Sequence, residues 1–236
     1  MVEKTLIPTE KYLKIGCHIG TKFKSGDMKR YIFKNRKDGL KVLDIETIDE
    51  RIRLAVELLS RFDPKTIAVV SRRLYGKTPV LKFAELVGAK AFTGRFVPGT
   101  FTNPNGKEFF EPKILIVSEP ESDDQAIVEA ERVRIPVIGL CSTNNELRGI
   151  DLVVPINNKG RKSLALFYCL AARELMKKKE IISKDEDFKF EIEDFEYQLK
   201  EGSENTSDGR EQRDEQYEEN GERRQRRSFQ RRPRTR

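Results

Sequence analysis

The sequence predicts an α/β protein whose mostly parallel sheet is covered by helices on both faces. Short apolar runs without polar alternation recur along residues 31–180, as in strands that are buried on both sides. Amphipathic stretches with apolar residues three to four positions apart separate these runs, as helices packed on a sheet require. This layering is flavodoxin-like or Rossmann-like.

The apolar runs give the expected strands and the amphipathic stretches the expected helices. The strands are residues 40–45, 66–70, 113–118, 137–141 and 152–155. Capping boxes at 47–50 and 122–125 predict two helix starts, and Thr78 followed by Pro79 predicts a third. The first of these helices should end before Asp63, and the one after Pro79 at Gly88. A last helix is expected over 163–178, and residues 92–110, rich in Gly, Pro, Asn and Phe, should form a long ordered loop.

Composition divides the chain into three parts. Residues 1–184 form the expected α/β domain, 185–201 an acidic segment with apolar residues that could dock on it, and 202–236 a disordered tail. Residues 185–222 hold 16 acidic and 4 basic residues, and 223–236 hold 8 arginines without an acid. Because the whole chain carries +7, residues 1–184 carry +11. Such an excess suits a polyanion, although it could serve solubility alone.

Motifs for small-ligand chemistry are incomplete. The stretch Tyr75–Gly76–Lys77–Thr78 resembles the end of a phosphate-binding loop, but that motif needs glycine at position 71, which is Ser71. Cys141 ends a strand and His18 is the single histidine, yet no local signature pairs them. The three cysteines lack zinc-finger spacing, so no metal and no cofactor is expected. Adjacent acids at Asp123 suit a helix start and need no catalytic explanation.

The chain is expected to work in the cytoplasm. The N-terminal ten residues lack the apolar stretch of a signal peptide. No apolar run approaches the roughly 18–20 residues of a membrane span, and widely separated cysteines fit a reducing compartment.

Basic residues gather in loops, where cations meet nucleic-acid phosphates more readily than along a helix face. The candidate RNA contacts are Lys22, Lys24, Lys29, Arg30, Arg36, Lys37, Arg72, Arg73, Lys77, Arg95, Lys159, Arg161 and Lys162. The last three stand at an expected helix start, where free N–H groups and the helix dipole favour an anion. We therefore expect a phosphate there, although simple solvation of the charges is the alternative.

Five blocks carry a family resemblance: GCHIGT at 16–21, DGLKVLD at 38–44, GRFVPGTFTNP at 94–104, IPVIGLC at 135–141 and NNKGRKS at 157–163. With their flanks they span residues 12–178 in order. The chain closely resembles the universal small-subunit ribosomal protein S-two family. The long helical projection of bacterial members is missing, which indicates the archaeal–eukaryotic branch. The resemblance leads us to expect Asp at positions 119 and 142, where the chain has Glu119 and Ser142.

The resemblance implies a structural constituent of the small ribosomal subunit, without catalysis or cofactor, that lies on its solvent side and supports assembly and the messenger-RNA path. Its partners would be small-subunit ribosomal RNA and neighbouring ribosomal proteins, with no membrane and no small-molecule substrate. The rival hypothesis is a small-ligand enzyme on the same sheet layering. The missing glycine-rich loop and the near absence of histidine favour the ribosomal hypothesis.

Overall fold

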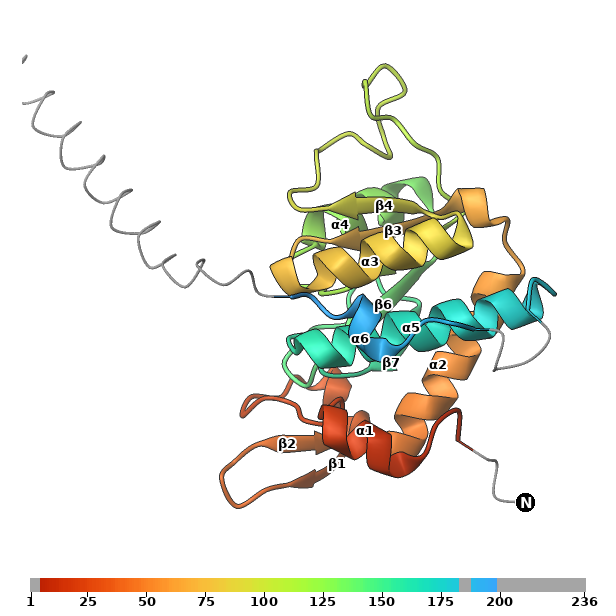
Figure 1. Ribbon diagram of the computed structural model, residues 1–236. Coiled ribbons are helices and arrows are strands. Elements are labelled where there is room, and N and C mark those ends of the chain that lie inside the picture. Colours follow the sequence, from red (N-terminus) through yellow and green to blue (C-terminus); the bar gives the residue numbers. More distant parts are fainter. Residues whose placement is uncertain (1–4, 183–187, 199–236) are drawn as a thin grey trace, which may run out of the picture. The chain divides into compact units, whose positions relative to one another are not determined.

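A five-stranded parallel sheet forms the centre of the computed structural model, which describes residues 5–182 and 188–198 (Figure 1). The strands, in their order across the sheet, are β4 (Lys90–Thr93), β3 (Ile67–Ser71), β5 (Ile114–Val117), β6 (Val137–Cys141) and β7 (Leu152–Pro155). Counted along the chain, the sheet has the order 2-1-3-4-5 of flavodoxin-like folds. The order reverses between β3 and β5, so the crevice that usually takes a ligand lies at the carboxyl ends of these two strands.

Helices cover both faces of the sheet, as the sequence predicted. Helices α2 (Ile45–Ser60), α3 (Leu74–Val87) and α5 (Arg161–Lys178) pack on one face. Helix α4 (Asp124–Val133) packs on the other. The alternation within β3 explains this division, because Ile67 and Val69 join the first core and Ala68 and Val70 the second.

The amino-terminal part adds a hairpin that the sequence analysis did not anticipate. Helix α1 (Thr9–Ile15) and the short helix η1 (Asp27–Tyr31) precede β1 (Ile32–Asn35), which pairs antiparallel with β2 (Lys41–Leu43). The strand expected at 40–45 is therefore shorter and belongs to this hairpin, outside the parallel sheet. Strand β1 gave no apolar signal because three of its four residues are exposed.

Three expected helix starts were wrong. Helix α2 is capped by Asp44, whose carboxylate accepts hydrogen bonds from the backbone N–H and the hydroxyl of Thr47 (3.4 and 2.6 Å), so there is no box at 47–50. The Ser122 hydroxyl donates to Glu119, and Ser122 lies one residue before the N-cap of α4, which is Asp123. In both places the hydroxyl donates a hydrogen bond to a carboxylate, where a capping box would have it accept one from a backbone N–H of the first turn.

Helix α3 begins at Leu74, four residues before the expected cap, and keeps Pro79 inside. Gly76 makes this early start possible, because a Cβ at that position would lie 2.1 Å from the Ser71 hydroxyl at the end of β3. The expected helix ends are confirmed: α2 ends before Asp63, and α3 ends at Gly88 in the left-handed conformation.

The segment after β4 is the long loop expected for residues 92–110, except that β4 itself takes Phe92 and Thr93. It is held by a cluster of phenylalanines, in which the Phe92 ring lies 5.9, 5.7 and 5.9 Å from the rings of Phe96, Phe101 and Phe110. These rings belong to the α4 side of the core. The loop is thus a folded covering of the sheet.

Residues 188–197 pack on the helix layer that contains α3 and α5. Their one-turn helix α6 (Ile192–Phe195) buries Phe195 completely in the core that contains α5, and the Tyr197 ring lies 6.0 Å from Tyr75. The three-part division expected from composition stays a prediction, and the tail at 202–236 lies outside the described residues. No helix within the described ranges is both long and apolar enough to cross a membrane.

Glu129 on α4 anchors the long loop. Its buried carboxylate accepts hydrogen bonds from the backbone N–H groups of Gly99 (2.7 Å) and Phe101 (3.1 Å) and from the Gln125 amide (2.8 Å). Burial alone would raise the pKa of Glu129, but these hydrogen bonds outweigh it and hold the pKa below its ordinary value of 4.5. The stability that the ionised carboxylate supplies is therefore complete above that value and disappears as the pH falls through the lower folded pKa.

Replacing Glu129 by Gln should lower the free energy of unfolding by about 2 kcal/mol at neutral pH, because a charged acceptor of two backbone N–H groups is lost. The difference from wild type should shrink as the pH falls below about 4. Urea unfolding at neutral pH and at a pH below about 4 measures this difference in the free energy of unfolding. Glu131→Gln, on the exposed side of α4, is the control. Equal stability of Glu129→Gln and wild type at neutral pH would contradict this role.

Candidate nucleic-acid interface

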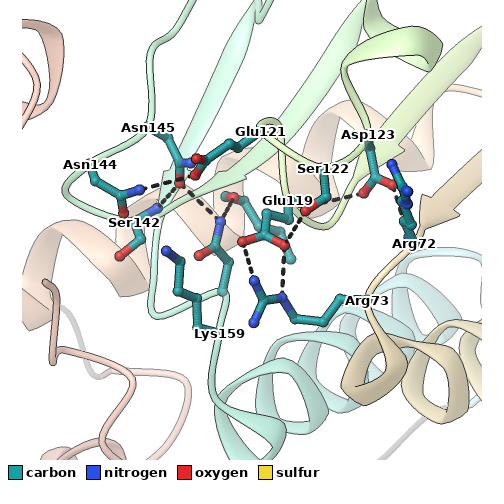
Figure 2. Close-up of polar contacts among 12 residues, drawn as sticks. Arg72, Arg73, Glu119, Glu121, Ser122, Asp123, Ser142, Asn144, Asn145 and Lys159 are labelled. Atoms are coloured by element: carbon teal, nitrogen blue, oxygen red, sulfur yellow. Dashed lines mark hydrogen bonds and ion pairs between the residues drawn. The ribbon is translucent and has the colours of Figure 1, made fainter. Parts of the chain in front are cut away.

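The carboxyl ends of the parallel strands share one edge of the sheet, and polar residues follow every strand there. Arg72 and Arg73 follow β3, Glu119 comes two residues after β5, and Ser142 follows β6. The loop from Asn157 to Gly160 joins β7 to α5. Because the strands are parallel, these loops lie together although they are far apart in the sequence (Figure 2).

An ion pair between Arg73 and Glu119 occupies the crevice where the strand order reverses. Two guanidinium nitrogens donate to the two carboxylate oxygens at 2.7 Å each, and Ser122 donates a third hydrogen bond at 2.7 Å (Figure 2). The side chain of Glu119 is 2% exposed and that of Arg73 32%. Doubly wound sheets bind small ligands at this point, but here the chain's own side chains fill it.

Asp123 also ties the same two loops together. Its carboxylate accepts the backbone N–H groups of Arg72 (2.8 Å) and Glu119 (3.3 Å). Burial raises the pKa of Asp123 to about 6, although these two hydrogen bonds oppose the shift. The acid at the helix start thus has a structural role, as the sequence suggested.

Two buried asparagines connect the loops after β6 and β7. The Asn145 side-chain oxygen accepts from the backbone N–H of Ser142 (2.7 Å) and from the Asn158 amide (3.0 Å). The Asn158 amide also donates to the Leu140 carbonyl (2.8 Å). The loops after β3, β5, β6 and β7 are therefore held in pairs by hydrogen bonds of buried side chains.

Helix α5 begins at this edge with basic residues. Gly160 caps it without a side-chain hydrogen bond. Arg161 is already paired, since its Nε lies 2.8 Å from a carboxylate oxygen of Glu196, which comes from the segment after α6. Part of the negative charge expected beside the three cations thus comes from Glu196 of the chain itself, and an RNA contact of Arg161 stays a prediction. Lys159 is half-buried and Lys162 exposed, and in the described part of the chain neither has a carboxylate within ion-pair distance.

The thirteen predicted contact residues fall into two groups. The edge cations follow the carboxyl ends of strands or begin the next helix: Arg72, Arg73, Lys77, Arg95, Lys159, Arg161 and Lys162. The hairpin cations lie on the hairpin, on η1 and on the loop before it: Lys22, Lys24, Lys29, Arg30, Arg36 and Lys37, all exposed. The two groups adjoin, because the backbone N–H of Thr21 donates to the hydroxyl of Thr143 after β6 (2.9 Å).

One cation near these groups was missed by the sequence analysis. The guanidinium carbon of Arg51 on α2 lies 5.6 Å from the centre of the Tyr31 ring, and that of Arg30 lies 4.9 Å from it. Both arginines line a shallow pocket with Lys29. Only loop cations were counted in the sequence, and Arg51 stands on a helix. No spacing rule could have found it, because its aromatic partner is 20 residues away.

Comparison with known proteins identifies the family. The model of the family "Ribosomal protein S2" matches residues 105–177. The small ribosomal subunit protein uS2 of Staphylothermus marinus is 50% identical over 186 residues, which cover 79% of this chain and 84% of that protein. The uS2 protein of Thermoplasma acidophilum is 50% identical over 192 residues, 81% of this chain and 96% of that protein. The chain belongs to the uS2 family.

Members of the uS2 family are structural ribosomal proteins and not enzymes, which agrees with the prediction from the sequence. The archaeal relatives fit the expected branch, and α2 is one ordinary helix where a bacterial projection would stand. The stretch Tyr75–Thr78 that resembled a phosphate-binding loop lies inside helix α3. The residues just before α3 include no glycine, so the glycine-rich loop of that motif is missing.

The thiols lack the environment of a nucleophile. Cys141 is completely buried and donates weakly to the Gly139 carbonyl (3.6 Å). Burial raises the pKa of Cys17 and of Cys141 to about 12 and that of Cys169 to about 11. Among the described residues, no three His, Cys, Asp or Glu side chains come close enough to hold a metal ion.

The three thiols should resist iodoacetamide at pH 8 in the folded chain, because only about one in a thousand or fewer is then a thiolate. All three should react once urea unfolds the chain. Mass spectrometry of the two samples counts the modified cysteines. Rapid modification of Cys141 in the folded chain would mean that a reactive cysteine had been overlooked.

Proposed function

We propose that this chain acts in the small ribosomal subunit as an RNA-binding structural component, with its edge cations on ribosomal RNA phosphates. The observation that carries the proposal is the placement of Lys159 and Lys162 at the start of α5. The first turn of an 18-residue helix presents N–H groups without intrahelical partners, and its N-cap Gly160 supplies no side-chain acceptor. A phosphate beside two lysines would satisfy both the N–H groups and the charges.

The charge of the domain supports the same partner. Residues 1–184 carry +11, and each lysine or arginine that meets a phosphate releases condensed counterions. Contacts of this kind fix the position of a protein on RNA and read little sequence. They suit a structural component whose loops are already rigid, since rigid loops lose little entropy on binding.

The proposal extends to neighbouring ribosomal proteins. The acidic residues of 185–222 suit basic protein partners, and the arginines of 223–236 suit RNA without sequence preference. The family's ribosomal membership makes both kinds of partner reasonable for this chain. Support of assembly and of the messenger-RNA path would follow from such contacts.

The edge favours this function over binding of a small molecule. A ligand in the crevice would have to displace the Arg73–Glu119 pair and leave a buried charge unpaired. The exposed side chains of Arg72, Lys77 and Lys162 at the same edge need no such rearrangement. An edge whose crevice is filled and whose exposed residues are basic therefore suits a large anionic surface such as RNA.

Replacing Lys159 and Lys162 by Ala should reduce the slope of log affinity against log salt by about 1.5–2 units, at roughly 0.7–0.9 per lost phosphate contact. Filter binding to small-subunit ribosomal RNA over a range of KCl concentrations measures the slope. Lys65→Ala with Lys113→Ala makes the same charge change on exposed residues beside the amino ends of β3 and β5. This control should leave the slope nearly unchanged.

Two results would contradict the proposed site. One is an unchanged slope for the Lys159 and Lys162 variant together with normal incorporation into subunits. The other is an equal loss of slope in the control, because the effect would then report total charge rather than this edge.

A further inference from the structure

Two phenylalanines in the amino-terminal part are the most exposed large apolar side chains among the described residues. Phe23 is 78% exposed and Phe33 69%. Single exposed apolar residues are common on protein surfaces and need no explanation. These two differ because the backbone fixes the place of each ring and cations surround both.

The backbone around Phe23 is tied to the end of β6. Its carbonyl accepts hydrogen bonds from the hydroxyls of Thr21 (2.9 Å) and Thr143 (3.0 Å). Two residues later, the N–H of Ser25 donates to the Thr143 carbonyl (2.9 Å). Thr143 is fully buried, so a rigid part of the domain holds the loop while the ring of Phe23 stands in solvent. A backbone held in this way loses little conformational freedom when the ring binds a partner.

Phe33 is exposed by a β-bulge. Ile32 pairs with Leu43 and Lys34 pairs with Val42, so Phe33 is the extra residue of β1 at this point. A bulge redirects side chains and disrupts the local pairing. The side chain that it exposes is aromatic, and Lys34 Nζ lies 5.9 Å from the centre of its ring.

The surroundings of the two rings decide between two kinds of partner. Lys22 and Lys24 flank Phe23, and Lys34 and Arg36 follow Phe33. Lysine is depleted in protein–protein interfaces, whose centres exclude charge. Aromatic rings interleaved with cations are instead typical of surfaces that bind single-stranded nucleic acid, where bases stack on rings and phosphates meet cations.

We propose that Phe23 and Phe33 stack on unpaired bases of ribosomal RNA, while the adjacent lysines hold the flanking phosphates. This inference rests on the proposed function and adds a second kind of contact to it. The edge cations need only phosphates and accept paired RNA, whereas stacking needs bases that have left a helix. The hairpin region would therefore select a loop, a bulge or a single strand.

The chain contains no tryptophan, so Phe23→Trp and Phe33→Trp each place a single tryptophan, which can be excited apart from the tyrosines, at the proposed contact. A base stacked on the indole ring quenches its fluorescence. Titration with single-stranded oligouridylate of about twelve nucleotides at low salt should quench both variants, and an RNA duplex of similar length should not. Phe190→Trp is the matched control, since Phe190 is exposed but lies near Glu191, Glu193 and Asp194. Its fluorescence should stay nearly constant.

Alanine and leucine variants separate stacking from the charge contacts. Phe23→Ala should weaken binding of the same oligonucleotide about fivefold or more without changing the salt slope, and Phe23→Leu should weaken it similarly because leucine has no π face. Phe23→Tyr should bind as wild type. The melting temperature should stay constant in all three variants, because the Phe23 ring is exposed.

The outcomes distinguish this inference from the proposed function. If wild type binds the oligonucleotide but no tryptophan variant is quenched, or if Phe23→Leu binds as wild type, the stacking inference is overturned and the phosphate contacts stand. Quenching by the duplex as strong as by the single strand would overturn it as well. If wild type binds neither the oligonucleotide nor the duplex nor ribosomal RNA at low salt, the proposed function and the stacking inference both fail.

Discussion

The pair of Arg73 and Glu119 is the interaction on which the functional edge depends. It joins the loops after β3 and β5 across the point where the strand order reverses. Removing Arg73 would leave the buried Glu119 carboxylate unpaired and cost about 3–5 kcal/mol. Asp123 joins the same two loops a second time, and the Asn145–Asn158 contact joins the loops after β6 and β7. The crevice that binds a ligand in related folds is thus filled by the chain's own side chains, and exposed cations lie on the loops around it.

Much of the fold could be predicted because its strands are buried on both faces. The bounds of β6 and β7 agree with the apolar runs at 137–141 and 152–155, since nothing but apolar residues fits between two helix layers. The hairpin was missed because β1 is mostly exposed and carries no such run. Helix starts were misplaced where a hydroxyl donates to a carboxylate, as Thr47 does to Asp44. The capping pattern alone does not show whether the hydroxyl accepts from the helix or donates to another residue.

The candidate site could be predicted only at the level of loops. Cations beside strand ends were visible in the sequence, but their partners were not, since Glu119 is 46 residues from Arg73 and Glu196 is 35 from Arg161. The two pairs tie Arg73 and Arg161 to the fold, whereas Lys159 and Lys162 have no carboxylate partner among the described residues. The exposure of Phe23 and Phe33 was also hidden, because it depends on a buried threonine far along the chain and on a bulge.

Sedimentation with small ribosomal subunits through a sucrose gradient tests the central claim, that the edge works through its outward cations. Wild type should travel with the subunits, and so should Arg73→Met combined with Glu119→Leu, because replacing both members of a buried pair by apolar residues is often neutral. The Lys159→Ala and Lys162→Ala variant should be released at a lower salt concentration than either. The account would be contradicted if wild type from its own cells formed a free pool with none on the subunits, or if only the Arg73 and Glu119 variant, still folded, lost the subunits.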